Sequence, residues 1–233
     1  MKIAIIHSVA GISSKALSLA LKNNGIESQV FRTSEIDKRD FYEFDHVFSF
    51  GTSYKTNHNH RLNSSAAVRN CISKPLSFEC FRRAQVNTVD YVLKKPIPKT
   101  WDWVVIRDDA EGRKAEGISY HENNEFVPDG NLYTEYFEHK YEYRIMVFRD
   151  KIVGRYFKQE ENGDWYFNLQ PVRGFEMMDD HCLRAAKALK IDYVGFDVVA
   201  NTKKDFRIIE ANSAARLTDE AETAIVEYFL NLE

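Results

Sequence analysis

The chain has 233 residues, of which 44% are hydrophobic and 29% are charged, and its formal net charge is −3. This is the composition of a globular protein with a substantial core, and the small net charge excludes a global attraction to nucleic acid or membranes. No apolar run reaches transmembrane length, and no signal peptide opens the sequence. The three cysteines show neither paired nor zinc-binding spacing, so we expect reduced thiols and a cytoplasmic location.

The N-terminal part of the chain predicts a small α/β lobe. An apolar strand at residues 3–6 precedes a helix that Ser13 or Ser14 caps and that Gly25 terminates, and a second strand follows at once. Such a β-α-β unit is normally parallel and right-handed. A third short strand at residues 46–50 extends the sheet. The first turn holds a single glycine, so the lobe is Rossmann-like but lacks a dinucleotide-binding fingerprint.

The middle of the chain predicts a second lobe with a polar loop. Two helices are followed by a linker that contains Pro96 and Pro98, which indicates a boundary. An apolar strand then ends in the cation Arg107 and runs into residues 108–118, a loop with two glycines and two cations. Backbone N–H groups of such a loop can cradle phosphate oxygens, while Arg107 neutralises their charge. An ordinary flexible hairpin loop is the alternative.

A β-hairpin is predicted around residues 142–158, followed by a helix that begins at Asp179 as its N-cap. Alternation puts Glu142 and Arg144 on one face of the first strand. Arg144 can pair with Glu142 or another carboxylate, which is the structural default. It can instead be aimed at an anion in a cleft, a task that suits a planar guanidinium.

A second hairpin, at residues 193–212, carries the strongest chemical signal. Its two apolar strands are joined by a short polar connection, which predicts antiparallel pairing. Glu210 and Asn212 alternate along one strand and share a face, and Asp197 lies in the middle of the other. Three such oxygen ligands suit Mg²⁺. Satisfied polar residues at strand ends are the alternative, although a buried carboxylate must be paired or bind a metal. Thr218 is expected to cap a final helix.

Taken in chain order, these pieces resemble the ATP-grasp family, and most of all its carboxylate–amine ligases, which include glutathione synthetase-like enzymes and short bacteriophage forms. The segments that carry the resemblance are Ser73-Lys74 before a helix, the strand ending at Arg107, the loop 111–118, the hinge 132–137, the triplet Glu142-Tyr143-Arg144, and Asp197 with Glu210 and Asn212. The resemblance implies an α/β ATP-grasp fold with a pre-ATP-grasp lobe at residues 1–70, a small lobe at 71–135 and a C-terminal lobe at 136–233.

The resemblance also implies ATP and Mg²⁺ as cofactors, with Asp197, Glu210 and Asn212 as metal ligands. The implied nucleotide contacts are Lys74, Arg107, Glu111, Gly112, Arg113, Lys114, Gly117, Glu135, Phe137 and Glu138. The implied catalytic cations are Arg144, Arg216 and Lys158. Residues 213–216 depart from the small-Pro-Gly pattern that is usual in the family after the metal strand, so the substrate side is not standard.

The activity that the resemblance implies is ATP-dependent amide formation between a carboxylate and an amine, through an acyl phosphate. An amino acid is expected as at least one substrate. The basic segment 69–99 leaves open a macromolecular acceptor, either a protein or a modified nucleic acid. Two other functions remain open: a kinase-like enzyme that stops at phosphoryl transfer, and a catalytically silent nucleotide-binding protein. No membrane association is expected.

Overall fold

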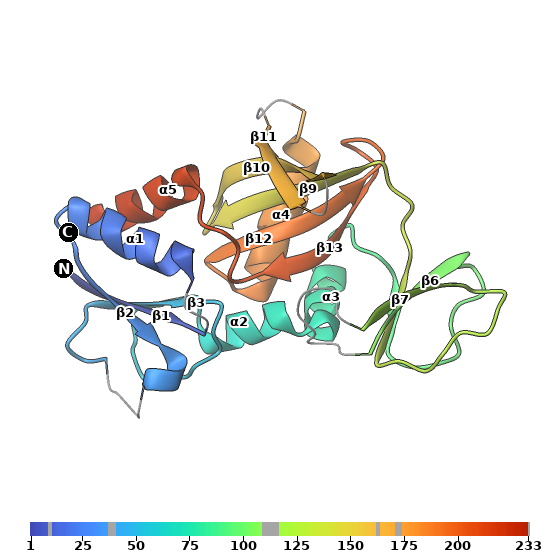
Figure 1. Cartoon of the computed structure of the whole chain (residues 1–233), viewed down its shortest axis with the longest axis horizontal. Coiled ribbons are helices and arrows are strands. Elements are labelled where there is room, and N and C mark those ends of the chain that lie inside the picture. Colours follow the sequence, from blue (N-terminus) through green and yellow to red (C-terminus); the bar gives the residue numbers. More distant parts are fainter. Residues whose placement is uncertain (9–10, 37–40, 109–116, 162–163, 171–173, 233) are drawn as a thin grey trace.

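The structure is a computed structural model that describes residues 1–8, 11–36, 41–108, 117–161, 164–170 and 174–232 (Figure 1). Its strands are β1 (Lys2–His7), β2 (Glu27–Arg32), β3 (His46–Phe50), β4 (Arg61–Leu62), β5 (Tyr91–Val92), β6 (Trp103–Arg107), β7 (Ile118–Glu122), β8 (Leu132–Glu135), β9 (Tyr141–Phe148), β10 (Lys151–Glu161), β11 (Asp164–Leu169), β12 (Tyr193–Ala200) and β13 (Phe206–Asn212). Its helices are α1 (Ile12–Asn23), α2 (Ser65–Ile72), α3 (Lys74–Arg83), α4 (Glu176–Leu189) and α5 (Asp219–Leu230), with a 3-10 turn η1 at Thr33–Glu35.

The first sheet has the strand order β2-β1-β3-β4, and its pairs are parallel. The predicted β-α-β unit is confirmed, and Gly25 ends α1 with φ +80°. The predicted serine cap is wrong, because Gly11 occupies the N-cap position without a side-chain hydrogen bond. Ser14 Oγ donates to the Gly11 carbonyl, and Ser13 Oγ accepts from the N–H of Leu217 at 3.1 Å. The Ser13 hydroxyl therefore ties α1 to the segment before α5.

The second sheet has the order β11-β10-β9-β12-β13 and is antiparallel. Helix α4 packs against one face of it and α5 against the other, beside α1 (Figure 1). Helix α4 begins after Phe175, so the prediction that Asp179 is its N-cap is wrong. Asp179 instead accepts hydrogen bonds from Arg155 of β10, with Nε to Oδ1 at 2.9 Å. This largely buried ion pair fastens α4 to the sheet.

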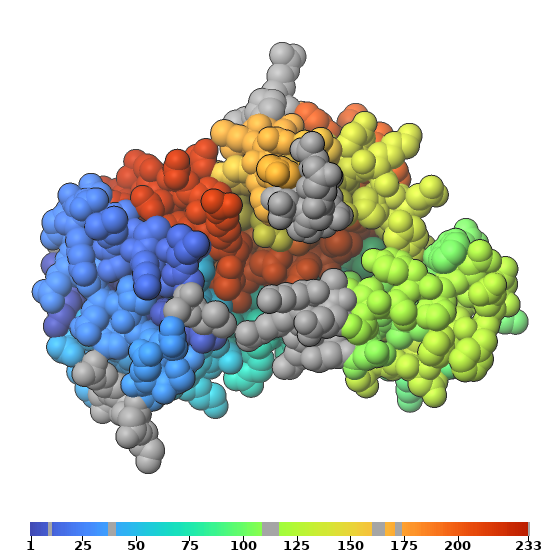
Figure 2. All heavy atoms as spheres, in the orientation of Figure 1, coloured from blue at the N-terminus to red at the C-terminus, as the bar shows by residue number. Residues whose placement is uncertain are grey.

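The third sheet, with the order β5-β8-β6-β7, stands apart from the first. Figure 2 shows the N-terminal part in blue on the left, the third sheet in green on the right, and the C-terminal elements in orange and red between them. The core of the third sheet is small, with Trp101, Val104, Ile106, Val127 and Tyr133 as its buried members. Strand β6 ends at Arg107, which lines a cavity together with Val199 of β12 and Ile209 of β13.

Two sets of hydrogen bonds join the first sheet to the second. Asn63 follows β4 with φ 54° and is fully buried; its Oδ1 accepts from the N–H groups of Asp192 and Tyr193 at 2.9 and 2.8 Å. Gly51 follows β3, and its N–H donates to the Ser213 carbonyl at 3.1 Å. The ends of β3 and β13 are therefore held side by side. Within the described ranges, no helix is long and apolar enough to cross a membrane.

Candidate functional site

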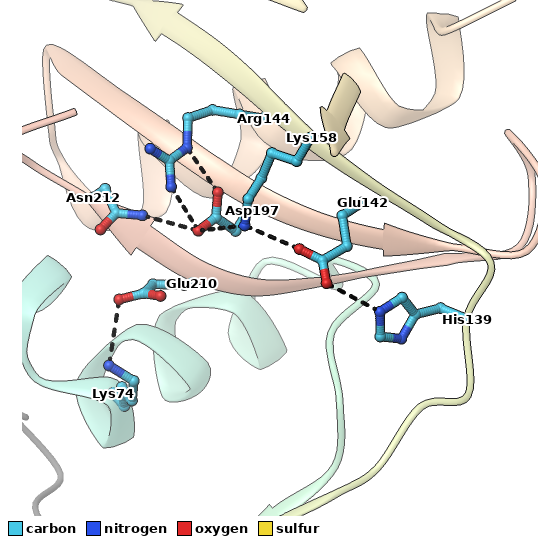
Figure 3. A network of polar contacts seen from close by, with 8 residues as sticks. All are labelled: Lys74, His139, Glu142, Arg144, Lys158, Asp197, Glu210 and Asn212. Carbon is cyan, nitrogen blue, oxygen red and sulfur yellow. Dashed lines mark hydrogen bonds and ion pairs between the residues drawn. The ribbon is translucent and has the colours of Figure 1, made fainter. Parts of the chain in front are cut away.

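A group of polar side chains shares one face of the second sheet (Figure 3). Its members are Glu142, Arg144, Lys158, Asp197, Glu210 and Asn212. Cross-strand partners in antiparallel sheets point to the same face. Asp197 of β12 is paired with Arg144 of β9 on one side and with Glu210 of β13 on the other. The opposite face of these strands is apolar and packs against α4. The predicted hairpin register thus brings the expected metal ligands together.

Asp197 is the centre of this group and is 6% exposed. Arg144 donates two hydrogen bonds to it, from Nε to Oδ1 at 2.7 Å and from Nη2 to Oδ2 at 2.8 Å. Asn212 Nδ2 lies 3.3 Å from Asp197 Oδ2, and Lys158 Nζ lies 3.7 Å from it. Burial is the largest single influence on the pKa of the Arg144 guanidinium and lowers it, but the charge of Asp197, its hydrogen bonds and the charge of Glu210 together outweigh burial and raise the pKa. Two roles were considered for Arg144, pairing with a carboxylate and binding an anion in a cleft, and the structure shows the pairing with a carboxylate.

Glu142 and His139 extend the network toward the hinge that follows β8. Lys158 Nζ lies 3.0 Å from Glu142 Oε2, and His139 Nε2 lies 3.3 Å from Glu142 Oε1. His139 Nδ1 is 2.8 Å from the Phe137 carbonyl oxygen. A continuous polar path therefore runs from the hinge to Asp197. Sequence reasoning named Lys158 but missed His139, because a histidine in a polar loop carries no signal of its long-range partner.

Glu210 is engaged from the other side by Lys74, at the start of α3. The distance from Lys74 Nζ to Glu210 Oε1 is 3.4 Å, and the Lys74 side chain is buried. Each carboxylate of the site is thus faced by at least one cation. No group of three or more His, Cys, Asp or Glu side chains is placed to hold a metal among the described residues. The predicted ligand set has two carboxylates and one amide, oxygen donors that suit Mg²⁺ when phosphates or water complete the shell.

A cavity of about 110 Å³ lies between the third sheet and the hairpin β12–β13. It is lined by Arg107, by the hinge residues Glu135 and Phe137, and by apolar side chains that include Val105 and Ile209. Burial raises the pKa of the Glu135 carboxyl and lowers the pKa of Arg107. A narrow apolar slot with a few polar groups at its rim is suited to a flat ring.

Arg107 contains a buried nitrogen without a partner. Its Nε is the single buried side-chain nitrogen or oxygen, among the described residues, that lacks a hydrogen-bond acceptor. An unsatisfied buried donor costs about 1–3 kcal/mol, so it needs an explanation in a folded protein. An anionic group beside the cavity would provide the acceptor and would offset the burial of the guanidinium. The cavity therefore fits a ligand that combines a flat ring with negative charge.

A second cavity, of about 630 Å³, lies between the strands that carry Arg144 and Tyr156 and the segment that leads into α5. It brings Arg144 and Arg216 to one space, although these arginines are 72 positions apart in the sequence. Its remaining walls include the aromatic rings of Tyr156, Tyr166 and Phe167. Arg144 lies over the ring of Phe167, with its guanidinium carbon 5.3 Å from the centroid. Two cations that converge on one cavity favour a carboxylate or phosphoryl ligand.

The remaining predicted contacts are distributed as follows. Glu111, Gly112, Arg113 and Lys114 lie outside the described residues. Gly117 is described and has φ +68°. Glu138 does not line the cavity at the hinge. The ring of Phe137 lies 4.7 Å from the Arg207 guanidinium, a cation that the sequence did not single out.

Comparisons with known proteins agree with this architecture. Residues 131–228 match the model of the RimK-like ATP-grasp domain. The ATP-grasp ligase PsnB in complex with a minimal precursor is similar over 99% of both chains, with a TM-score of 0.76 and 14% identity. The macrocyclase MdnC with precursor peptide MdnA, from Microcystis aeruginosa, covers 99% of this chain and 100% of its own, with a TM-score of 0.68 and 13% identity. A search of curated proteins gives no match by sequence.

A third structure widens the comparison. The D-alanine–D-alanine ligase of Bacillus anthracis in complex with ATP covers 100% of this chain and 95% of its own, with a TM-score of 0.69 and 15% identity. PsnB has also been solved with Mg and ADP. The protein therefore has the ATP-grasp fold over its whole length. Residues 131–228 match the RimK-like ATP-grasp domain, in agreement with the ATP-grasp family expected from the motifs.

Proposed function

We propose that the protein is an ATP-dependent ligase that joins a carboxylate to an amine. The observation that carries this proposal is the buried Nε of Arg107, which lacks an acceptor within the described part of the chain and belongs to a residue that lines the 110 Å³ cavity. In this proposal the adenine ring occupies the cavity beside Glu135 and Phe137, with Glu138 near the ribose. The phosphates extend past Arg107 and Lys74, near Gly117.

Mg²⁺ fits the oxygen donors at the opposite wall. Asp197, Glu210 and Asn212 would hold it, since the register of β12 and β13 puts these side chains on one face. When bound, the ion neutralises phosphate charge and orients the terminal phosphate. In the described part of the protein Asp197 and Glu210 are each paired with a cation. We therefore expect the site to favour Mg²⁺ that arrives together with ATP over free Mg²⁺.

The proposed reaction has two steps. A carboxylate oxygen of the first substrate attacks the γ-phosphorus, and the bond to the bridging oxygen of ADP breaks, which gives an acyl phosphate. The amine nitrogen then attacks the carbonyl carbon, loses a proton, and inorganic phosphate leaves with the electrons of the C–O bond. Arg144 and Arg216 neutralise the oxygens that gain charge, and Lys158 supports Arg144 at Asp197. Catalysis rests on positioning and charge, without a covalent protein intermediate.

Isothermal titration tests the nucleotide and metal assignment. The wild-type protein and an Asp197→Asn/Glu210→Gln variant are titrated with ATP and Mg²⁺ together, with ATP alone, and with Mg²⁺ alone. We expect the variant to lose at least about tenfold in affinity for the combined ligand, since the charges that face the metal are gone. A Glu222→Gln/Glu227→Gln variant removes two carboxylates from α5 and should bind as the wild type does. Equal affinities of all three proteins would refute the assignment.

Product analysis tests the reaction. The protein is incubated with ATP, Mg²⁺ and pooled amino acids and polyamines, and mass spectrometry is used to search for condensation products whose formation requires ATP. A new amide together with ADP and phosphate supports the ligase. If ADP and a stable phosphorylated product form without dependence on an amine, the protein is a kinase-like enzyme instead of a ligase. Nucleotide binding without any turnover would favour the catalytically silent alternative.

A further inference from the structure

A cavity of about 880 Å³ lies outside the proposed active site, where the turn between β9 and β10 meets the ends of α4 and α5. None of the residues assigned above to nucleotide, metal or catalysis lines it. Its charged lining residues are Arg149, Asp150, Arg184, Lys187, Lys190 and Asp192. Basic side chains are thus twice as numerous as acidic ones in a protein whose net charge is −3. We call this feature the basic cavity.

Two of the four basic side chains of the cavity are available to a ligand, and the other two are held in place. Lys187 and Lys190 form no side-chain hydrogen bond or ion pair with any residue that the structure describes, and both are exposed. Arg149 is in the left-handed region with φ 55°, and its guanidinium carbon lies 4.6 Å from the centre of the Tyr228 ring. Arg184 is oriented by the carbonyl oxygens of residues 84 and 85, at 3.0 and 2.9 Å from its Nη1.

The acidic side chains cancel only part of this charge. Asp192 turns its Oδ2 to the N–H of Asn63 at 2.7 Å, and burial raises the pKa of its carboxyl. Asp180, outside the cavity, pairs with Arg184 at 3.0 Å. Asp150 is the other carboxylate of the lining. The negative end of the α4 dipole explains one or two lysines in the last turn of a helix, but it does not explain an arginine held in place on a separate turn.

We propose that the basic cavity binds an acidic peptide segment, in which two or three Asp or Glu side chains lie close together. The argument is charge complementarity at a cavity of ligand-binding size. A nucleic acid fits less well, because single strands are bound through exposed aromatic faces. The Tyr228 ring is covered by Arg149 and makes edge contacts with Phe148 and Phe229.

The basic cavity is separate from the proposed active site but mechanically linked to it. Arg149 follows β9, the strand that carries Arg144, and five residues of extended chain span roughly 16 Å. Asp192 immediately precedes β12, the strand that carries Asp197. A partner that docks here would therefore be held at a fixed distance from the catalytic network. This proposal does not depend on the ligase reaction, since it concerns binding at another surface.

Fluorescence anisotropy with labelled octaglutamate tests the proposal. We expect binding that weakens with added salt, and octaglutamine at the same concentration should not bind. A Lys187→Glu/Lys190→Glu variant should bind octaglutamate at least about tenfold more weakly, because two attractive charges become repulsive. The matched control is Lys15→Glu/Lys22→Glu on α1, which makes the same change of charge on another exposed helix and should bind as the wild type does. Affinity for ATP and Mg²⁺ should be equal in all three proteins, which confirms that they are folded.

Three results would overturn the proposal. The first is an equal loss of octaglutamate binding in both lysine variants, which would indicate a non-specific effect of net charge. The second is no binding of octaglutamate by the wild-type protein at low salt. The third is tighter binding of labelled oligothymidylate than of octaglutamate, with the same dependence on Lys187 and Lys190, which would assign the cavity to nucleic acid.

Discussion

Arg107 lowers the stability of the fold in a way that a purely structural residue would not. Its Nε is buried and has no hydrogen-bond acceptor among the residues that the structure describes, and burial lowers the pKa of the guanidinium. Arg155 offers a direct contrast, because its guanidinium is also largely buried but is fully engaged by Asp179. Arg155 stabilises the fold, whereas we propose that Arg107 contacts an anionic ligand. Replacing each with the same apolar residue should separate these roles.

We predict opposite effects on stability for Arg107→Met and Arg155→Met. The first should leave the free energy of unfolding unchanged or raise it by about 1 kcal/mol, since an unsatisfied donor is removed. The second should lower it by about 3 kcal/mol, since Asp179 is left as a buried unpaired charge. Urea denaturation measures both, and titration with ATP and Mg²⁺ should show lost affinity for Arg107→Met alone. Destabilisation of both variants to the same extent would contradict the contrast.

Individual site residues differ in how far the sequence predicts them. Asp197, Glu210 and Asn212 could be found because alternation along a strand fixes which side chains share a face. Arg144 could be placed on the same face, but its bidentate pair with Asp197 depends on a pairing of strands that are 53 residues apart. His139 and Asn63 could not be found, because each acts through partners in another element. The local sequence pattern predicts the face to which a side chain points, whereas contacts between residues of different elements require the structure.

At the scale of elements, β10 and α5 are joined at the wall of the 630 Å³ cavity that Arg144 and Arg216 line. Tyr156 of β10 donates a hydrogen bond to Glu220 Oε2 of α5 at 2.6 Å, and both residues line that cavity. Burial, reinforced by this hydrogen bond, raises the pKa of Tyr156 to about 12. The same bond lowers the pKa of Glu220 below its ordinary value of 4.5. The pair thereby holds the segment that carries Arg216 against the sheet.

We predict that Tyr156→Phe lowers the free energy of unfolding by about 1 kcal/mol at neutral pH, through loss of a hydrogen bond to a carboxylate. Because the folded pKa of Glu220 is depressed, its stabilisation is present above the unfolded value and is lost as pH falls through the folded value. The difference between wild type and variant should therefore shrink well below pH 4.5. Urea midpoints across this range measure it. A difference that stays constant down to strongly acidic pH would show that Glu220 is not the partner that matters.

The termini of elements were predictable where a local rule operates alone. Gly25 ends α1, and the Thr218 side chain caps α5 by accepting from the N–H of Ala221, both as predicted. Ser13 and Asp179 were assigned to caps by the same rules, yet their side chains are used for contacts with Leu217 and Arg155. A long-range partner therefore overrides the local preference. Strand β11 carried no pattern strong enough to predict.

At the scale of the molecule, the contact between Gly51 and Ala214 sets how the first sheet meets the second. Gly51 has φ +64°, and a Cβ at this position would lie 2.3 Å from the Cβ of Ala214. This is far inside van der Waals contact. The approach is close because the Gly51 N–H donates to the neighbouring Ser213 carbonyl. The first sheet can therefore approach the end of β13 this closely only because position 51 has no side chain.

We predict that Gly51→Ala lowers the free energy of unfolding by about 3 kcal/mol, from the clash and the left-handed backbone together. Gly25→Ala is the matched control, since Gly25 also has positive φ but no atom lies within 4 Å of the added Cβ; it should cost only about 1 kcal/mol. The double variant Gly51→Ala/Ala214→Gly should regain most of the free energy of unfolding by which Gly51→Ala falls below Gly25→Ala. Thermal and urea unfolding measure all three variants. Equal costs for Gly51→Ala and Gly25→Ala would rule out the clash.

The overall architecture was predictable from the order of motifs more than from any one of them. The three sheets follow the chain in the expected sequence, and the fold matches over its whole length. The lobe boundaries at residues 70 and 135 stay a prediction. The orientation of the lobes could not be predicted, because contacts such as that of Asn63 with Tyr193 join residues 130 positions apart. Hydrophobic periodicity contains no information about such distances.

Strand β12 is buried at every one of its eight positions and lies between two neighbours of the same sheet. The Asp197 carboxylate is therefore carried by a strand that we expect to resist local unfolding most strongly. Asp197 is thereby insulated from the edge strand β11, because β10 and β9 lie between them. In the proposed ligase, substitutions at that edge would alter the fit of a substrate without moving the carboxylate that is proposed to hold the metal.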